Sequence, residues 1–449
     1  MKRAHNRVIA MEYTHRIDAC FSKASDDPDL NASRLANTPY TAMLARTQPA
    51  LDQIRQWCKD GTLPLLALPY RQDDIDQVTP LAARFRDSFD DVIVLGTGGS
   101  SLGAKSLYAL ADFGWGPPQG TPRLHFMDNV DPHTFDALFA TLDWTHTGIL
   151  TISKSGHTAE TLIQTTICLA RMGAVMGKDE LRNHVVAITE APADETGTNP
   201  LRVLANRYDI PILDHDPLVG GRYAALSVVG LLPTMIVGLD PTAIRDGAAS
   251  VLDETLAAMT PADSAPATGA ALSIGLAQEC GIAATVIMPY LDRLASFAAW
   301  HRQLWAESLG KGGAGTTPIN AIGTVDQHSQ VQLYLDGPAD KMFTVICGPS
   351  AGAGDPVTEV GIDYLEGRRM GDLLDACQRA TVETLAARGR PVRIMELSIV
   401  NERTMGALMM HFMLETIIAG YLLGVDPFDQ PAVEEGKTLT RRYMAELDA

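Results

Sequence analysis

Short runs of apolar, often β-branched residues alternate along the chain with longer segments of helical periodicity. Such alternation is typical of β-α-β units, in which helices cover a mostly parallel sheet. The runs that we expect to form strands are 91–95, 124–127, 149–152, 185–188 and 210–213, followed by 284–288, 342–346 and 392–397. The pattern predicts an α/β protein with two doubly wound units.

An Ala-, Pro- and Ser-rich stretch, TPADSAPATGA (260–270), separates the two groups of strands and indicates a connection between two α/β halves. The tail after residue 425 begins with a Pro-bounded loop, and we expect it to end as a charged surface helix. We divide the chain into an N-terminal helical segment (1–55), a first α/β domain (56–255), a second α/β domain (256–425) and a C-terminal tail (426–449).

The charge and cysteine content narrow the functional classes. The 449 residues include 36 Lys and Arg against 54 Asp and Glu, a formal net charge of −18, with no basic patch. This excess of negative charge argues against nucleic acid and anionic membranes as partners. The longest uncharged run, 223–239, contains Pro233 and is shorter than the ~20 residues of a membrane span, so we expect a buried helix. Six scattered cysteines without a CxxC pair, and no signal-peptide pattern, indicate a cytoplasmic protein.

A glycine-rich stretch, GTGGSSLGAKSL (96–107), directly follows a predicted strand. Glycines and serines at a strand-to-helix turn allow backbone N–H groups to approach an anion, so we favour contact with a sugar or phosphate. A dinucleotide site is one alternative, with Asp128 binding the ribose, although Ser101 stands where the fingerprint needs Gly or Ala. A tight turn without a ligand is the other alternative.

A second strand-to-helix turn, TISKSGHTAETL (151–162), is rich in hydroxyl groups. Ser153, Ser155 and Thr158, with Lys154 beside them, are the kind of donors that a phosphate monoester needs at a helix N-terminus. Ser and Thr also serve as helix caps for purely structural reasons, and that alternative stays open.

Two further segments carry a candidate cation and a candidate base. In LVGGRYAALSVVGLL (218–232), Arg222 follows two glycines and precedes an apolar helix, where it could bind an anion or stabilise an enediolate; the alternative is a surface arginine. In WHRQLWAESLGKGG (300–313), the spacing puts Glu307 on an apolar helix face, where it could act as a proton-transfer base. The alternative is an i, i+4 salt bridge from Glu307 to Lys311.

The last two segments hold a histidine and a lysine. His328 lies in GTVDQHSQVQLYLDGP (323–338) and could act as an acid or base in opening a sugar ring, or simply be a structural histidine. Lys437 lies in DPFDQPAVEEGKTL (426–439), and without further context it is a surface lysine. No metal-binding, P-loop or nucleophile-elbow motif accompanies these segments, so we expect neither a metal nor a cofactor.

Taken in order, the six segments closely resemble the glucose-6-phosphate isomerase (phosphoglucose isomerase) family, in its shorter bacterial type. The stretch GTGGSSLG is similar to the family's sugar-phosphate loop, SKSGHT to its phosphate-binding SKTxxT, and GGR to its arginine loop. ESLGK is similar to its ESxGK helix, GTVDQHS to its histidine loop and DQPAVEEGK to its C-terminal lysine motif. The resemblance extends from about residue 91 to residue 437, and Ser155 stands where many members have Thr.

The resemblance implies two sugar-isomerase (SIS) type α/β/α sandwich domains and the reversible conversion of glucose 6-phosphate to fructose 6-phosphate through a cis-enediol. It also implies that no metal takes part and that the protein is a homodimer in which His328 is contributed across the interface. The implied catalytic residues are Glu307 as the base between C1 and C2, Arg222 as the stabiliser of the cis-enediol, and His328 and Lys437 in ring opening. The implied substrate-binding residues are Ser153, Lys154, Ser155 and Thr158 for the phosphate, and Gly99, Ser100 and Gln430 for the sugar.

A non-catalytic SIS-type sugar-phosphate-binding regulator is the alternative function. Such regulators usually lack the Glu, His and Lys set or carry a DNA-binding helix-turn-helix, and this acidic chain shows no basic recognition segment. A dinucleotide-dependent oxidoreductase is a third hypothesis, and it would require nicotinamide binding.

Overall fold

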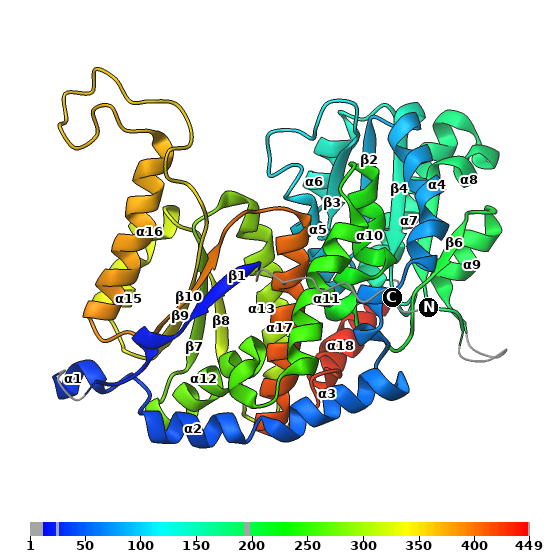
Figure 1. Ribbon diagram of the computed structural model, residues 1–449. Helices are drawn as coiled ribbons and strands as arrows, with labels where there is room; N and C mark the ends of the chain where they lie inside the picture. The colour runs from blue at the N-terminus through cyan, green and yellow to red at the C-terminus, as the bar shows by residue number, and fades with distance from the viewer. Residues whose placement is uncertain (1–11, 24–26, 193–197, 448–449) are drawn as a thin grey trace, which may run out of the picture.

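The computed structural model describes residues 12–23, 27–192 and 198–447. Two five-stranded sheets lie side by side, each with helices packed on it (Figure 1). The first sheet has the order β3-β2-β4-β5-β6 and is parallel throughout. The second has the order β1-β10-β9-β7-β8, and only its edge strand β1 is antiparallel to its neighbour. The predicted α/β class with mostly parallel sheets is confirmed.

The strands are β1 (Tyr13–Arg16), β2 (Asp91–Leu95), β3 (Arg123–Met127), β4 (Thr147–Ile152), β5 (Val185–Thr189), β6 (Ile212–Asp214), β7 (Ala284–Pro289), β8 (Thr317–Asn320), β9 (Lys341–Cys347) and β10 (Val392–Leu397). Each of the eight predicted strands is present, with ends that move by no more than two residues. β1 and β8 were not predicted. β1 lies inside the segment that we expected to be helical, so that expectation is wrong for residues 13–16.

The helices are α1 (Pro28–Asn31), α2 (Asn37–Ala45), α3 (Gln48–Asp60), α4 (Asp73–Ser88), α5 (Leu102–Tyr108), α6 (Pro132–Phe139), α7 (Ala159–Met176), α8 (Leu181–His184), α9 (Pro200–Arg207), α10 (Val228–Ile236), α11 (Pro241–Ala257), α12 (Ala265–Cys280), α13 (Ala295–Leu309), α14 (Val325–Ser329), α15 (Val331–Asp336), α16 (Met370–Ala387), α17 (Glu402–Leu423) and α18 (Glu434–Glu446).

Helix α17 is the core helix between the two sheets (Figure 1), and it packs against α11, α12 and α13. By length and composition it could cross a membrane, but 89% of its most apolar window is buried inside the protein. Burial by neighbouring helices accounts for its apolar surface, since a helix that is hydrophobic all round belongs in a core or a bilayer. The expected buried helix within 223–239 is confirmed as α10, in which every residue is buried.

The stretch 260–270 is only partly a connection. Pro261–Asp263 form a short 3-10 turn, but α12 begins at Ala265. The side chain of Ser264 caps this helix by accepting a hydrogen bond from the backbone N–H of Ala267, and Pro266 suits the first helical turn. The Ser, Pro and Ala residues that begin α12 have the composition of a linker, which is why the sequence indicates a connection over the whole stretch. The division of the chain into domains stays a prediction.

The C-terminal tail ends as the expected surface helix, because every residue of α18 is exposed. Before it, the loop Asp426–Gln430 contacts Lys311, just after the end of α13. The tail is thus a loop fixed to the body of the protein, followed by a helix with a solvated surface.

A buried polar cluster joins β1, β10 and α17. The guanidinium of Arg393 donates to both carboxylate oxygens of Glu415 at 2.8 Å, and the ring of His411 lies 3.0 Å from the same carboxylate. The hydroxyl of Tyr13 lies 2.6 Å from the other ring nitrogen of His411. His301 of α13 packs edge-on against Phe412 next to this cluster, and burial lowers the pKa of its imidazole to about 3.

Candidate active site

The glycine-rich turn and the arginine loop are in direct backbone contact. β2 ends at Leu95, and the turn that follows presents Gly99 to Gly221 and Arg222. A Cβ on Gly99 would lie 2.2 Å from the carbonyl carbon of Gly221 and 2.4 Å from the nitrogen of Arg222. Only glycine leaves room for this approach. Two motifs that are far apart in the sequence therefore form one surface.

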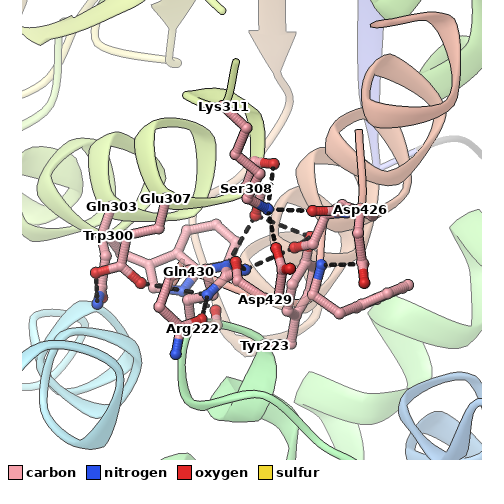
Figure 2. Close-up of polar contacts among 12 residues, drawn as sticks. Arg222, Tyr223, Trp300, Gln303, Glu307, Ser308, Lys311, Asp426, Asp429 and Gln430 are labelled. Carbon is pink, nitrogen blue, oxygen red and sulfur yellow. Dashed lines mark hydrogen bonds and ion pairs between the residues drawn. The ribbon is translucent and has the colours of Figure 1, made fainter. Parts of the chain in front are cut away.

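Arg222 is the centre of the polar network in Figure 2, although it is only 3% exposed. Its Nε donates to the hydroxyl of Ser308 at 2.8 Å, and its Nη1 donates to Gln430 at 2.7 Å and to Glu307 at 3.3 Å. Its Nη2 donates to the carbonyl oxygens of Pro427 at 2.7 Å and Asp429 at 2.9 Å. The alternative of a surface arginine is wrong, because the guanidinium is buried and its hydrogen bonds set its orientation.

Glu307 lies half-buried near the end of α13 and faces Arg222. Its Oε2 accepts from Arg222, and its Oε1 accepts from Nε2 of Gln303, one helical turn earlier, at 3.0 Å. The alternative i, i+4 salt bridge is wrong. Lys311 donates instead to the carbonyl oxygens of Ser308 and Asp426, and it lies 2.8 Å from the carboxylate of Asp429. The structure thus brings Arg222, Glu307, Gln430 and the Gly99 turn together.

The hydroxyl-rich turn Ser153–Thr158 follows β4, at the same sheet edge as the Gly99 turn, because β2 and β4 are parallel neighbours. The buried Ser153 hydroxyl donates to that of Thr158 at 3.0 Å, and Thr158 is the N-cap residue of α7. An anion bound here would face the positive end of an 18-residue helix.

The shape of this turn depends on a residue that sequence reasoning missed. Gly156 has a φ of +68°, and a Cβ there would lie 1.8 Å from Oδ1 of Asn199. Asn199 is itself fixed, because its side-chain amide donates to Thr189 at 2.8 Å and to the carbonyl of Glu190 at 3.0 Å. The Asn-Pro pair before α9 is a helix-cap signal that could have identified it.

Lys154 links the turn to the rest of the site. Its Nζ donates to the carbonyl of Pro217 at 2.6 Å. Its pKa lies below the usual range, mainly because burial disfavours the charged form, and the positive charge of Arg222 adds to the effect. Ser155 is exposed, and its hydroxyl accepts from the backbone N–H of His157 at 3.3 Å.

The structure does not bring His328 and Lys437 into this network. The side chain of His328 is exposed on α14, and no hydrogen bond or ion pair joins it to the side chain or backbone of another described residue. Lys437 lies on α18, where it pairs with Glu434 at 2.6 Å. Ser100 takes part in the Gly99 turn through its backbone N–H, which donates to Thr97 at 3.2 Å. The roles expected for His328 and Lys437 stay predictions.

Two further observations concern the alternative of a dinucleotide site and the question of a metal site. Asp128, which a dinucleotide site would use for a ribose, forms an ion pair with Lys105 at 3.1 Å. Over residues 12–23, 27–192 and 198–447, no group of three or more His, Cys, Asp or Glu side chains is arranged to hold a metal ion.

Three residues of the network were missed as site residues: Gln303, Ser308 and Lys311. Gln303 lies four residues before Glu307 and so shares its helix face, and a helical projection could have found it. Ser308 and Lys311 belong to the ESLGK segment, but their roles depend on the tail loop, which is more than 100 residues away in the sequence.

A buried arginine beside a glutamate, with a hydroxyl-lined helix N-terminus at the same sheet edge, is an arrangement suited to proton transfer on a bound anion. The model of the family described as phosphoglucose isomerase matches residues 82–334. The chain is 36% identical over 388 residues to a glucose-6-phosphate isomerase of Rubrobacter xylanophilus, covering 84% of this chain and 88% of the relative. It is 37% identical over 425 residues to that of Thermus thermophilus, covering 90% and 97%. The chain belongs to the phosphoglucose isomerase family.

Two solved structures share the fold of this chain. A crystal structure of a hypothetical protein from Thermus thermophilus matches with a TM-score of 0.79 and 34% identity, covering 91% of this chain and 98% of that chain. A glucose-6-phosphate isomerase from Chlamydia trachomatis matches with a TM-score of 0.66 and 21% identity, covering 98% and 82%, and shares the fold.

Proposed function

We propose that this chain catalyses the reversible isomerisation of glucose 6-phosphate to fructose 6-phosphate through ring opening and a cis-enediol intermediate. The observation that carries the proposal is the contact between the Glu307 carboxylate and the buried Arg222 guanidinium. Moving a proton between two carbons next to a carbonyl needs one base and one cation for the negative oxygen that develops. Family membership fixes the class of reaction to which this pair is applied.

In this mechanism Glu307 removes the proton from one carbon and returns it to the next. Because one of its carboxylate oxygens accepts from Gln303 and the other from Arg222, the carboxylate is held in a fixed orientation. Arg222 stabilises the charge on the enediol oxygens, since a guanidinium keeps its charge when it is desolvated. Gly99 and Ser100 of the glycine turn and Gln430 of the tail contact the sugar.

The phosphate is bound by Ser153, Lys154, Ser155 and Thr158. Their hydroxyl and backbone groups lie at the N-terminus of α7, so binding needs little net positive charge. This local recognition is consistent with a protein whose net charge is −18. His328 and Lys437 assist in opening the ring.

The protein acts as a cytoplasmic homodimer, and His328 reaches the active site of the partner subunit. His328 is exposed and takes no part in the hydrogen bonds of Arg222 and Glu307, which supports this assignment. The six cysteines are all free thiols, which fits a reducing compartment.

Mixing His328→Ala and Glu307→Gln variants would form hybrid dimers with one intact site, and would restore about a quarter of the wild-type activity. Recovery of no activity on mixing would contradict the shared site.

The test of the reaction is conversion of fructose 6-phosphate followed directly by NMR, without added cofactor and with a chelator, and with mannose 6-phosphate alongside. Glu307→Gln is expected to lower kcat by at least ~10²-fold, because it removes the proton acceptor while keeping the shape of the side chain. Glu279→Gln, at an exposed position on α12, is the matched control. Full turnover by Glu307→Gln would refute the assigned base.

A further inference from the structure

The tail loop, residues Asp426–Gln430, is held on the protein by two cations from the body of the fold. Arg222 donates to the carbonyl oxygens of Pro427 and Asp429 and to the side chain of Gln430. Lys311 donates to the carbonyl oxygen of Asp426 and lies 2.8 Å from the carboxylate of Asp429. Figure 2 shows both cations converging on this short loop.

Two residues connect the cations to each other. Ser308 accepts from Arg222 with its hydroxyl and from Lys311 with its carbonyl oxygen. Asp429 accepts from Arg222 with its carbonyl oxygen and pairs with Lys311 through its carboxylate. The position of the Arg222 guanidinium is therefore coupled to the position of the Lys311 ammonium on two sides.

The Lys311 side chain is only 14% exposed, so its ammonium is largely shielded from water and its donors need oxygen partners. One partner is the carbonyl oxygen of Ser308, and by donating to it the Lys311 ammonium caps the C-terminus of α13, which is a common structural task for a lysine. The other two partners belong to the tail loop. Asp429 is half exposed, and ion pairs of this kind add little to overall stability. The contact is better suited to placing the loop than to stabilising the fold.

Release of the tail loop would change what Arg222 binds. Three of its five hydrogen bonds go to this loop, and the other two go to Ser308 and Glu307. Without the loop, the guanidinium would turn toward Glu307 and form a closer ion pair. In that ion pair each charge would offset the other. Arg222 would then be less available to the enediol oxygens, and Glu307 less available to accept the proton.

We propose that Lys311 is a positioning residue for the reaction, which fixes the tail loop and thereby holds Arg222 at a set distance from Glu307. This role rests on the proposed isomerase function. Lys311 itself does not contact the substrate: it acts through Asp429 and Ser308 on the orientation of the guanidinium.

The test measures kcat and KM of Lys311→Met, which keeps most of the aliphatic stem and removes the cation. A fall in kcat of ~10-fold or more is expected, because a charged group loses its hydrogen-bonded alignment. KM should rise by a smaller factor, because Gln430 moves with the loop while the Ser153–Thr158 turn that binds the phosphate is untouched. Asp429→Asn should reproduce part of the effect, since it removes the carboxylate but keeps the carbonyl that Arg222 uses. Lys311→Arg should restore much of kcat. Lys341→Met removes a similarly buried, ion-paired lysine on β9 and serves as the matched control.

Hydrogen exchange gives a readout that does not depend on activity. Backbone amides of 426–433 should exchange faster in Lys311→Met than in wild type, while those of β9 should not change. If Lys311 only caps α13, Lys311→Met would leave both kcat and the hydrogen exchange of the tail unchanged, and that result would overturn the proposal. An effect of Lys311→Met on KM alone would overturn it as well. An inactive wild-type chain would instead refute the proposed function, whereas an active wild type with an equally active Lys311→Met would refute only the role of Lys311.

Discussion

The substitution Gly99→Ala tests whether the catalytic geometry depends on the contact between the glycine turn and the arginine loop. A methyl group at this position would lie 2.2 Å from the carbonyl carbon of Gly221, whereas ordinary contact begins at 3.4 Å. The obstacle is backbone, so no side chain can rotate away, and the two loops must separate by about 1.2 Å. Overpacking of this kind costs ~1–3 kcal/mol of stability. A displacement of about 1 Å in a catalytic group costs ~10²-fold in rate.

The assay is isomerisation of fructose 6-phosphate under saturating substrate, together with urea denaturation of the same sample. We expect kcat to fall by ~10²-fold while the protein remains folded. Gly221→Ala is the reciprocal variant: its methyl group would lie 3.6 Å from the Cα of Gly99, an ordinary contact, so its effect should be much smaller. Gly173→Ala on α7, where the nearest neighbour would lie at 3.5 Å, controls for helix effects. Equal activity of Gly99→Ala and wild type would refute the reasoning.

The remaining predictions concern stability. His301 has a pKa of about 3 when folded and about 6.5 when unfolded, because burial disfavours its charged form. The unfolded chain therefore takes up the proton first, and stability should fall below pH 6.5 by roughly 1–2 kcal/mol per pH unit for this residue; a flat profile in urea unfolding between pH 7 and 5 would contradict this. Arg245 donates to both carboxylate oxygens of Asp74 at 2.6 and 2.7 Å in a buried site. Asp74→Ala should cost ~3–5 kcal/mol, because it leaves a buried cation unpaired, and a loss below ~1 kcal/mol would argue otherwise.

The sequence predicts strands best where mostly apolar residues run together. β2 and β10 have the predicted bounds, because apolar runs with few breaks fill the centre of each sheet. β8 was missed because Pro318 interrupts its pattern, which an edge strand tolerates and a central strand does not. β1 was missed because its four residues carry only one buried side chain, so neither length nor periodicity marks it.

The site was predictable in its chemistry but not in its connections. The residue types indicated that Arg222 binds an anion and that Glu307 acts as a base, and the structure places these two side chains in contact. The helical spacing suggested that Lys311 pairs with Glu307, but the tail loop offers it oxygen acceptors that a pattern within one helix does not reveal. Likewise, the absence of space at Gly99 depends on a loop more than 100 residues later in the chain.

The pairing of β1 with β10 has a consequence for how the protein is made. Tyr13 lies opposite Leu397, so β1 pairs with a strand that is translated about 380 residues after it. At ~5–20 residues per second, translation leaves this strand without its partner for ~20–80 s. The second sheet is therefore completed only after β10 has emerged, and until then the backbone N–H and C=O groups of β1 are open to other partners such as chaperones.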